Sequence, residues 1–331
     1  MKTTGKFIIS LDFELLWGVR DLQTTDTYGE NILGVWEALP KMLKAFEKNG
    51  VKATWATVGF LFASSKKELL NYCPTNRPSY LVKNLSPYNG HFDQLEEEEE
   101  QDKYHFASKL IKLIRKYPNQ EIATHTFSHY YCLERGQTKE EFNDDTLAAI
   151  KIANKDDIEI KSLVFPRNQF NNEYLEIIKS LGITSYRGNE SAWFYNYEFG
   201  QEEKPTKRAF RLLDSYLNIS GHNCYSLEEI GKKEPYNIPS SRFLRPYSSK
   251  LKMFEGLRLQ RILKSMTYAA KNGKVFHLWW HPHNYGTDQK ENFIFLNKIL
   301  SHYVFLKEKY NFESLTMNKL SELLKKEQVN G

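Results

Sequence analysis

The stretch KFIISLDFE, at residues 6–14, decides the predicted fold. Residues 6–13 are rich in isoleucine and phenylalanine and contain no glycine or proline, which is typical of a buried strand. Asp12 and Glu14 stand at its end, where a strand period of two points both carboxylates to the same side. Two carboxylates on one buried face repel each other unless a positive group lies between them. The alternative is a partly exposed strand end that pairs with lysine or arginine.

Strand-like and helical patterns alternate along the rest of the chain. Six or seven strand–helix units in series imply a parallel sheet with helical crossovers, and so an α/β fold. We expect one domain over residues 1–331. Further strands are predicted at 51–58, 121–124, 162–165, 183–186, 241–245 and 274–280, and helices at 35–48, 60–70, 106–117, 139–153, 173–181, 251–272 and 290–310.

Two segments interrupt this alternation. Residues 73–102 contain three prolines and the acidic run 96–100, and residues 188–238 are rich in aromatic residues without a clear period. Both are predicted to be long inserted loops, and the acidic run is expected to face solvent.

Composition and charge exclude several classes of protein. The net charge is only +5, and no basic cluster is present, so no nucleic-acid partner is expected. No apolar run is long enough for a membrane-spanning helix, and the apolar stretch near the N-terminus is too short for a signal peptide. The three cysteines are widely spaced, which argues against a disulfide framework and against a zinc ribbon. We expect a cytoplasmic protein and leave its oligomeric state open.

A pair of histidines follows the predicted strand 121–124. His125 and His129 have HxxxH spacing, which on a helical turn places both rings on one face at metal-binding distance. Two neutral imidazoles and one carboxylate are the protein ligands of an open catalytic zinc site.

A second group, His277, His281 and His283, closes the predicted strand 274–280 and competes for the same role. His277 is expected to be a hydrogen-bonded core residue. His281 falls at the carboxyl end of the strand, where ligands bind in parallel α/β folds, and is expected to be functional.

Taken in order, these segments resemble the polysaccharide deacetylases of the NodB-homology type. The letters SLDFE are similar to that family's first motif, which implies Asp12 as the catalytic base and Glu14 as a metal ligand. The letters HTFSH match the second motif, H-[ST]-x-x-H, in full, and imply His125 and His129 as the other two ligands.

Three later segments are similar to the remaining motifs. The letters FPRN, in altered order, imply that Arg167 holds the catalytic Asp12. Trp193 is a candidate for the aromatic wall of the fourth motif. The letters WWH end a strand in His281, as the fifth motif does, which implies His281 as the catalytic acid.

The resemblance spans about residues 6–320 and implies a distorted (β/α)7-type barrel with long inserted loops. It also implies one divalent metal, with Zn²⁺ ahead of other divalent transition metals. Besides the altered order of FPRN, the chain departs from the family pattern in two further ways: Phe13 replaces the usual second aspartate directly after Asp12, and Glu14 stands where aspartate is more common.

The function that these residues imply is metal-dependent removal of an N-acyl group, in the first place N-acetyl, from an amino sugar. Asp12 would act as the general base toward water, Arg167 would keep it ionised, and His281 would protonate the leaving nitrogen. The resemblance adds capsule or O-antigen biosynthesis as the pathway, with a nucleotide-linked, lipid-linked or oligosaccharide substrate. Arg245 and His283 are further candidates for contact with this substrate.

Three alternatives stay open. A deformylase or ring-opening amidase of the same fold would use the same residues on a different acyl group. A glycoside hydrolase would use Asp12 and Glu14 as its acid and base without a metal. A non-catalytic glycan-binding relative would keep the aromatic insertions and show no turnover.

Overall fold

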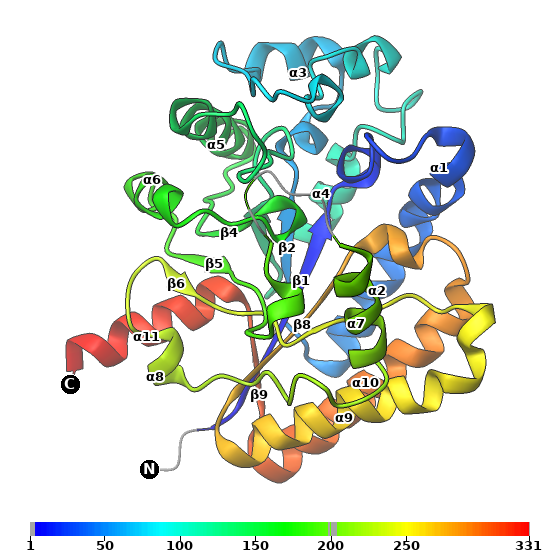
Figure 1. Ribbon diagram of the computed structural model, residues 1–331, viewed down its shortest axis with the longest axis vertical. Helices are drawn as coiled ribbons and strands as arrows, with labels where there is room; N and C mark the ends of the chain where they lie inside the picture. Colours follow the sequence, from blue (N-terminus) through cyan, green and yellow to red (C-terminus); the bar gives the residue numbers. More distant parts are fainter. Residues whose placement is uncertain (1–3, 198, 200–203, 331) are drawn as a thin grey trace.

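One parallel sheet organises the protein (Figure 1). The computed structural model describes residues 4–197, 199 and 204–330. Within them the strands follow the order β6-β5-β4-β3-β2-β1-β8-β7, and β9 pairs with β1 outside this path. This arrangement confirms the predicted distorted (β/α)7-type barrel. The strands are β1 Lys6–Phe13, β2 Thr54–Thr57, β3 Glu121–Thr124, β4 Ser162–Val164, β5 Ser185–Arg187, β6 Tyr236–Asn237, β7 Arg242–Phe243, β8 Val275–Trp280 and β9 Glu313–Leu315.

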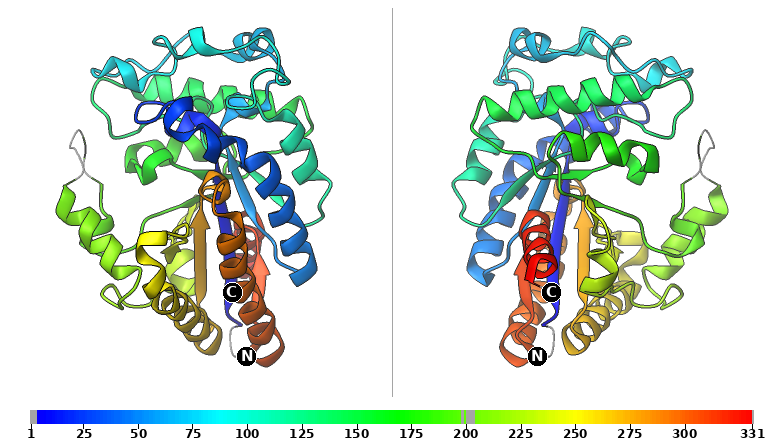
Figure 2. Two further views of the ribbon diagram at one scale, coloured as in Figure 1. Left: turned by 90° about the vertical axis from the view of Figure 1, so that its right-hand side faces the viewer. Right: turned by 90° about the vertical axis from the view of Figure 1, so that its left-hand side faces the viewer.

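Helices cover the outer face of the barrel, as Figure 2 shows. In the part of the chain that the structure describes, no helix has the length and apolar character needed to cross a membrane. The helices are α1 Thr25–Leu33, α2 Val35–Asn49, α3 Lys66–Tyr72, α4 Ser108–Arg115, α5 Lys139–Asn154, α6 Leu175–Ser180, α7 Pro205–Asp214, α8 Leu227–Ile230, α9 Glu255–Asn272, α10 Gln289–Tyr310 and α11 Met317–Asn330.

The alternation of side chains along β1 separates two cores. Phe7 and its alternate neighbours belong to the large apolar cluster between the strands and the outer helices. Ile8 belongs to a smaller cluster inside the barrel. Because successive strand residues point to opposite faces, Ser10 and Asp12 continue the inner row. The strand therefore delivers Asp12 to the carboxyl end of the barrel interior.

A single extended segment, residues 236–244, closes the barrel. Its first part bonds to the β5 side: Ile238 N donates to Tyr186 O at 2.9 Å. Its second part bonds to β8: Ser241 N donates to His277 O at 2.8 Å. β6 and β7 are thus two ends of one segment that changes partner, which explains why each is only two residues long.

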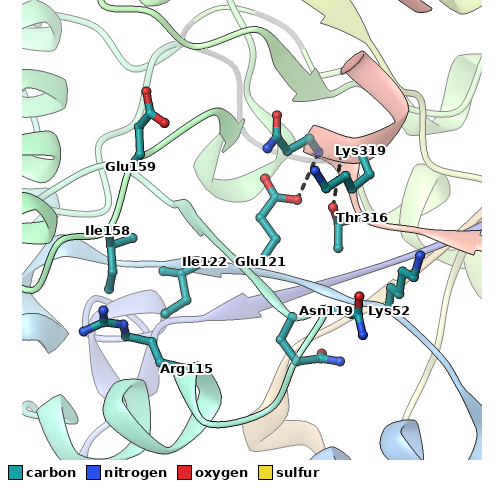
Figure 3. A pocket seen from close by; sticks show the side chains of 11 residues that line it. Lys52, Arg115, Asn119, Glu121, Ile122, Ile158, Glu159, Thr316 and Lys319 are labelled. Carbon is teal, nitrogen blue, oxygen red and sulfur yellow. Dashed lines mark hydrogen bonds between the residues drawn. The ribbon is translucent and has the colours of Figure 1, made fainter. Parts of the chain in front are cut away.

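Helix α11 closes the other end of the barrel, at the amino ends of the strands. Leu320 and Leu324 join the inner cluster around Ile8. Glu121, the first residue of β3, labelled in Figure 3, accepts a hydrogen bond at Oε2 from Asn318 N, 3.0 Å away in the first turn of α11. The same oxygen accepts from the Thr54 hydroxyl of β2. The pocket drawn in Figure 3 surrounds this contact and lies at the opposite end of the strands from Asp12.

The two predicted insertions are more ordered than the sequence suggests. The segment 73–102 packs back on the barrel, because Arg20 donates to Leu85 O and the Phe92 ring contacts that of Trp17. Residues 96–98 and 100 of the acidic run are exposed, as predicted, but Glu99 is buried and accepts hydrogen bonds from Ser108 Oγ and Lys109 N at the start of α4. The segment 188–238 contains α7, α8 and β6.

Candidate active site

Asp12 is held by an arginine from β5. Arg187 Nη1 donates to Asp12 Oδ1 at 2.6 Å, and Nη2 donates to Oδ2 at 2.7 Å. The same guanidinium donates to Ser10 Oγ and Asn168 Oδ1, and it lies 4.1 Å from the centroid of the Trp279 ring. Burial by itself would raise the pKa of Asp12, but the Arg187 guanidinium outweighs burial and holds this pKa below its ordinary value. Asp12 is therefore an oriented, ionised carboxylate.

The prediction that Arg167 holds Asp12 is wrong. Arg167 follows β4 in a turn and makes an ion pair with Asp21 instead. Arg187 has the inward position because it pairs in register with Val164, which faces the barrel interior. One signal in the sequence could have identified Arg187: a charged residue inside a short buried strand needs a buried partner of opposite charge.

Glu14 lies between the two histidines of the HxxxH segment. Its Oε2 is 3.2 Å from His125 Nε2 and 3.1 Å from His129 Nε2, and all three side chains are buried. Their ligand atoms lie within 4.8 Å of one another, so this group could hold a metal ion. His125 Nδ1 is 2.8 Å from Val164 O, a contact that leaves Nε2 free to face Glu14. On the other side, Arg20 Nη1 lies 3.4 Å from His129 Nδ1.

The protonation states around Glu14 suit a cation. Burial would raise the pKa of Glu14, but His281, His125 and His129 beside it hold this pKa well below its ordinary value. Burial lowers the pKa of His129 to about 3. The His129 imidazole is therefore neutral near pH 7, and the neutral form is the one that binds metals.

The segment between the two histidines is a loop, whereas the sequence analysis predicted a helical turn. Thr126 and His129 both have left-handed backbone conformations, with φ of 62° and 58°. Such conformations are costly for these residue types and persist only when their surroundings impose them. Asp145 of α5 supplies that constraint, because it accepts hydrogen bonds from Phe127 N, from Ser128 N and from Ser128 Oγ. Asp145 is a residue that the sequence analysis missed.

His281 and His283 face the carboxylates from the end of β8. His281 Nε2 lies 3.8 Å from Asp12 Oδ2 and 3.7 Å from Glu14 Oε1, and its Nδ1 lies 3.3 Å from Asn284 Oδ1. The His283 ring stacks on that of His281 with centroids 4.9 Å apart, and its Nδ1 is 3.9 Å from Glu14 Oε1. His283 is buried and His281 is half-buried. His281 is therefore the member of this pair that an incoming molecule can reach more easily.

His277 lies deeper in the barrel, away from this group. Its Nε2 is 2.8 Å from Ser10 Oγ, and its Nδ1 is 3.1 Å from Ile238 O. Both ring nitrogens therefore have partners, and burial lowers the pKa of His277 to about 3. The residue is a neutral, hydrogen-bonded part of the core, as the sequence analysis expected.

A pocket of about 240 Å³ opens beside His281. Trp193, the predicted aromatic wall, is not among its lining residues: this side chain is 54% exposed and packs against Phe210, with ring centroids 5.3 Å apart. Trp279, on β8, is the indole that lines the pocket. The complete lining is Asn168, Asn189, Glu190, Tyr195, Tyr197, Arg211, Ser215, Arg242, Phe243, Arg245, Trp279 and His281.

Comparisons with solved structures identify the fold. A protein from Mycobacterium smegmatis assigned as a polysaccharide deacetylase superposes with a TM-score of 0.63 at 10% identity, covering 99% of this chain and 92% of that one. A 4-alpha-glucanotransferase from Thermococcus litoralis superposes with a TM-score of 0.51 at 12% identity, covering 95% of this chain and 37% of that one. A carbohydrate esterase family 4 pseudoenzyme from Bacillus anthracis has a TM-score of 0.46 at 13% identity, covering 97% of this chain and 66% of that one. At identities of 10% and 12%, the first two superpositions show the fold alone.

Comparison with family models gives a more specific result. The model described as "Polysaccharide deacetylase" matches residues 33–186, a range that includes His125 and His129 but not Asp12, Glu14 or His281. No curated protein sequence matches the chain. The family match therefore relates residues 33–186, slightly under half of the chain, to the polysaccharide deacetylases, and the barrel fold agrees with that match.

Proposed function

We propose that this protein is a metal-dependent hydrolase that removes an N-acyl group, in the first place N-acetyl, from an amino sugar in surface-polysaccharide biosynthesis, as in capsule or O-antigen assembly. The observation that carries the proposal is the juxtaposition of Asp12, clamped through both oxygens by Arg187, with the Glu14, His125 and His129 group. A fixed carboxylate beside a candidate metal site is the arrangement that metal-assisted hydrolysis needs.

The donor set fits a divalent transition metal. Glu14, His125 and His129 offer one oxygen and two imidazole nitrogens, the set found in open catalytic zinc sites. His125 has the carbonyl contact of its other ring nitrogen that usually orients a ligating histidine. When bound, the metal supplies the Lewis acidity that polarises an amide carbonyl and makes a neighbouring water easier to deprotonate.

The chain's own residues then supply the proton transfers. Asp12 takes a proton from water, and Arg187 keeps Asp12 ionised and prevents its carboxylate from turning away. His281 faces Asp12 and Glu14 from the other side of the site and donates a proton to the nitrogen that leaves. The pocket beside His281 receives the sugar.

The electrostatics disfavour a glycoside hydrolase that works through Asp12 and Glu14. Such an enzyme needs one carboxyl group that stays protonated near neutral pH because its pKa is raised. Arg187 holds the pKa of Asp12 below its ordinary value, and the neighbouring histidines hold that of Glu14 well below its own. Neither residue can therefore serve as the acid.

Two measurements on the purified chain test the proposal. The first is its content of divalent metal, and the second is release of acetate or formate from matched N-acetyl and N-formyl amino sugars. We expect about one metal ion per chain, acetate release, and loss of activity with a strong chelator that is restored by Zn²⁺ or another divalent transition metal. Formate release with no acetate would favour the deformylase alternative. No turnover of any acylated amine by the metal-loaded protein would contradict the proposal.

A further inference from the structure

The pocket beside His281 is continuous with the groups that hold Asp12. Its lining includes Trp279, whose ring lies under the Arg187 guanidinium, and Asn168, which accepts a hydrogen bond from Arg187. The Phe243 ring contacts those of Trp279 and His281, with centroids 4.6 and 5.8 Å away. Arg245 follows two residues later and lines the same pocket, so a substrate held at His281 extends toward Arg245.

Most of the charged groups around this pocket have partners of opposite sign. Arg242 is buried and forms an ion pair with Asp214, which also accepts from Arg261. Glu190 is buried, and burial raises its pKa, although the Arg242 and Arg187 guanidinium groups oppose that shift. The positive charge of these arginines is therefore shared with carboxylates inside the protein.

Arg245 differs from Arg242 in this respect. It is half-buried, and among the residues that the structure describes its guanidinium makes no hydrogen bond and no ion pair. Burial lowers the pKa of Arg245, Tyr216 and Tyr195 oppose that shift, and the nearby Arg258 and Arg211 guanidinium groups add to it. A partly desolvated guanidinium without a counter-ion costs free energy, which an entering anion would offset.

We propose that Arg245 binds an anionic group, a phosphate or a carboxylate, on the amino-sugar substrate, and so selects charged sugars over neutral ones. A guanidinium presents two parallel N–H donors to either group, which gives orientation as well as attraction. This inference names the substrate class of the site and rests on the proposed function.

Binding rather than turnover gives the clearest test. The full chain carrying Asp12→Asn, loaded with Zn²⁺, is titrated calorimetrically with N-acetylglucosamine, N-acetylglucosamine 1-phosphate, the corresponding uronic acid and inorganic phosphate. We expect at least one anionic sugar to bind about tenfold or more tightly than the neutral sugar. Preference for the phosphate identifies a phosphorylated substrate, and preference for the uronic acid identifies a carboxylated one.

Variants assign this preference to Arg245. In the same background, Arg245→Gln is expected to reduce the preference to less than about twofold, and Arg245→Lys to retain part of it. Arg115→Gln removes the same charge from the pocket at the opposite end of the barrel and should leave the preference intact (Figure 3). A preference that survives Arg245→Gln, or the absence of any preference for the three anions before Arg245 is changed, overturns the inference. Anion preference in a protein without deacylase activity would contradict the proposed function but not the anion subsite.

Discussion

At the scale of single residues, Asp12 and Glu14 stand two positions apart, yet their surroundings prepare them for different tasks. Both oxygens of Asp12 accept hydrogen bonds from Arg187, whereas Glu14 Oε2 faces two imidazole nitrogens. An arginine partner leaves a carboxylate charged and oriented but keeps a metal from its oxygens. Asp12 therefore suits the role of base, and Glu14 suits that of ligand.

Exchanging each carboxylate for its amide separates these roles. Asp12→Asn is expected to retain the metal and to lose at least ~100-fold in kcat, the usual scale for a general base. Glu14→Gln is expected to lose metal and activity together, and so are His125→Ala and His129→Ala. Elemental analysis and acetate release measure the two effects. If Asp12→Asn lost the metal while Glu14→Gln retained it, Asp12 would be the metal ligand and Glu14 the base.

A comparison of two arginines tests the clamp on Asp12. Arg187→Met leaves a buried carboxylate without its cation, so kcat/KM should fall by ~100-fold or more. Because Arg187 holds the pKa of Asp12 down, its removal raises that pKa, and the acidic limb of the pH profile should move to higher pH. Arg167→Gln breaks the pair with Asp21 and the contact with the Tyr131 ring but leaves Asp12 clamped, so it should be milder. If kcat/KM fell more for Arg167→Gln than for Arg187→Met, Arg167 would be the residue that holds Asp12 in place.

The two histidines after β8 are expected to differ. His281→Ala should lower kcat by ~100-fold or more with the metal retained, because His281 is nearer to both carboxylates and more accessible. Substrates with better leaving amines should lose less, since they need less protonation at departure. His283→Ala should be milder. If His283→Ala were inactive and His281→Ala active on the same substrates, His283 would be the catalytic acid.

At the scale of elements, the loop after β3 depends on α5 for its conformation. Asp145 holds the backbone between the two histidines through Phe127 and Ser128. Burial raises the pKa of Asp145 to about 7, from an ordinary value of 3.8, although the hydrogen bonds to Ser128 and Phe127 oppose that shift.

This shift predicts a pH dependence of stability. Because the folded-state pKa is raised, the folded protein binds this proton more tightly than the unfolded chain does between about pH 4 and pH 7. The contribution of Asp145 is complete below about pH 4 and is lost as the pH rises to about 7. Asp145→Asn cannot titrate, so its free energy of unfolding should fall less than that of the wild type between pH 5 and pH 8.

Urea unfolding at the two pH values measures this difference. The matched control is Asp144→Asn, one residue away, where the side chain is only half-buried and bonds to Asn76. This variant should show the pH dependence of the wild type. If the free energy of unfolding changed equally between pH 5 and pH 8 for the wild type and Asp145→Asn, Asp145 would be ionised in the folded protein throughout this range.

At the scale of the whole molecule, the two ends of the barrel differ in function. The carboxyl ends of the strands bring together Asp12, Glu14 and the histidines, whereas the amino ends are closed by α11. Glu121 caps the first turn of α11 at this second end. Stability and catalysis should therefore be separable by mutation.

Glu121→Ala tests that separation. Loss of the cap should lower the free energy of unfolding by about 1–2 kcal/mol, the range for helix N-caps, and leave metal content unchanged. Glu322→Ala, on the same helix, breaks a solvent-exposed pair with Lys319 and a hydrogen bond from the Asn318 side chain, and should change the free energy of unfolding by less than about 0.5 kcal/mol. Urea unfolding and elemental analysis report the two effects. Loss of metal in folded Glu121→Ala would contradict the separation.

The sequence by itself determined the parts of this protein that depend on local patterns. The strands at 6–13 and 121–124 have the predicted bounds, and the carboxylate pair, the HxxxH pair and His281 all follow strands of one parallel sheet. Parallel strands present their carboxyl ends at one edge, so these residues could be expected to meet before any coordinates were known. Apolar periodicity within ten residues is enough for that inference.

Only the tertiary structure decided which partners these residues have. Arg187 lies 175 positions from Asp12, and its choice over Arg167 depends on the register of β5 against β4. The left-handed loop at His129 depends on Asp145, and the place of Arg245 in the pocket beside His281 depends on the packing of β7 against β8. Such contacts join residues far apart in the chain, so their energies are set by burial and geometry in the folded barrel, which no local pattern of residues encodes.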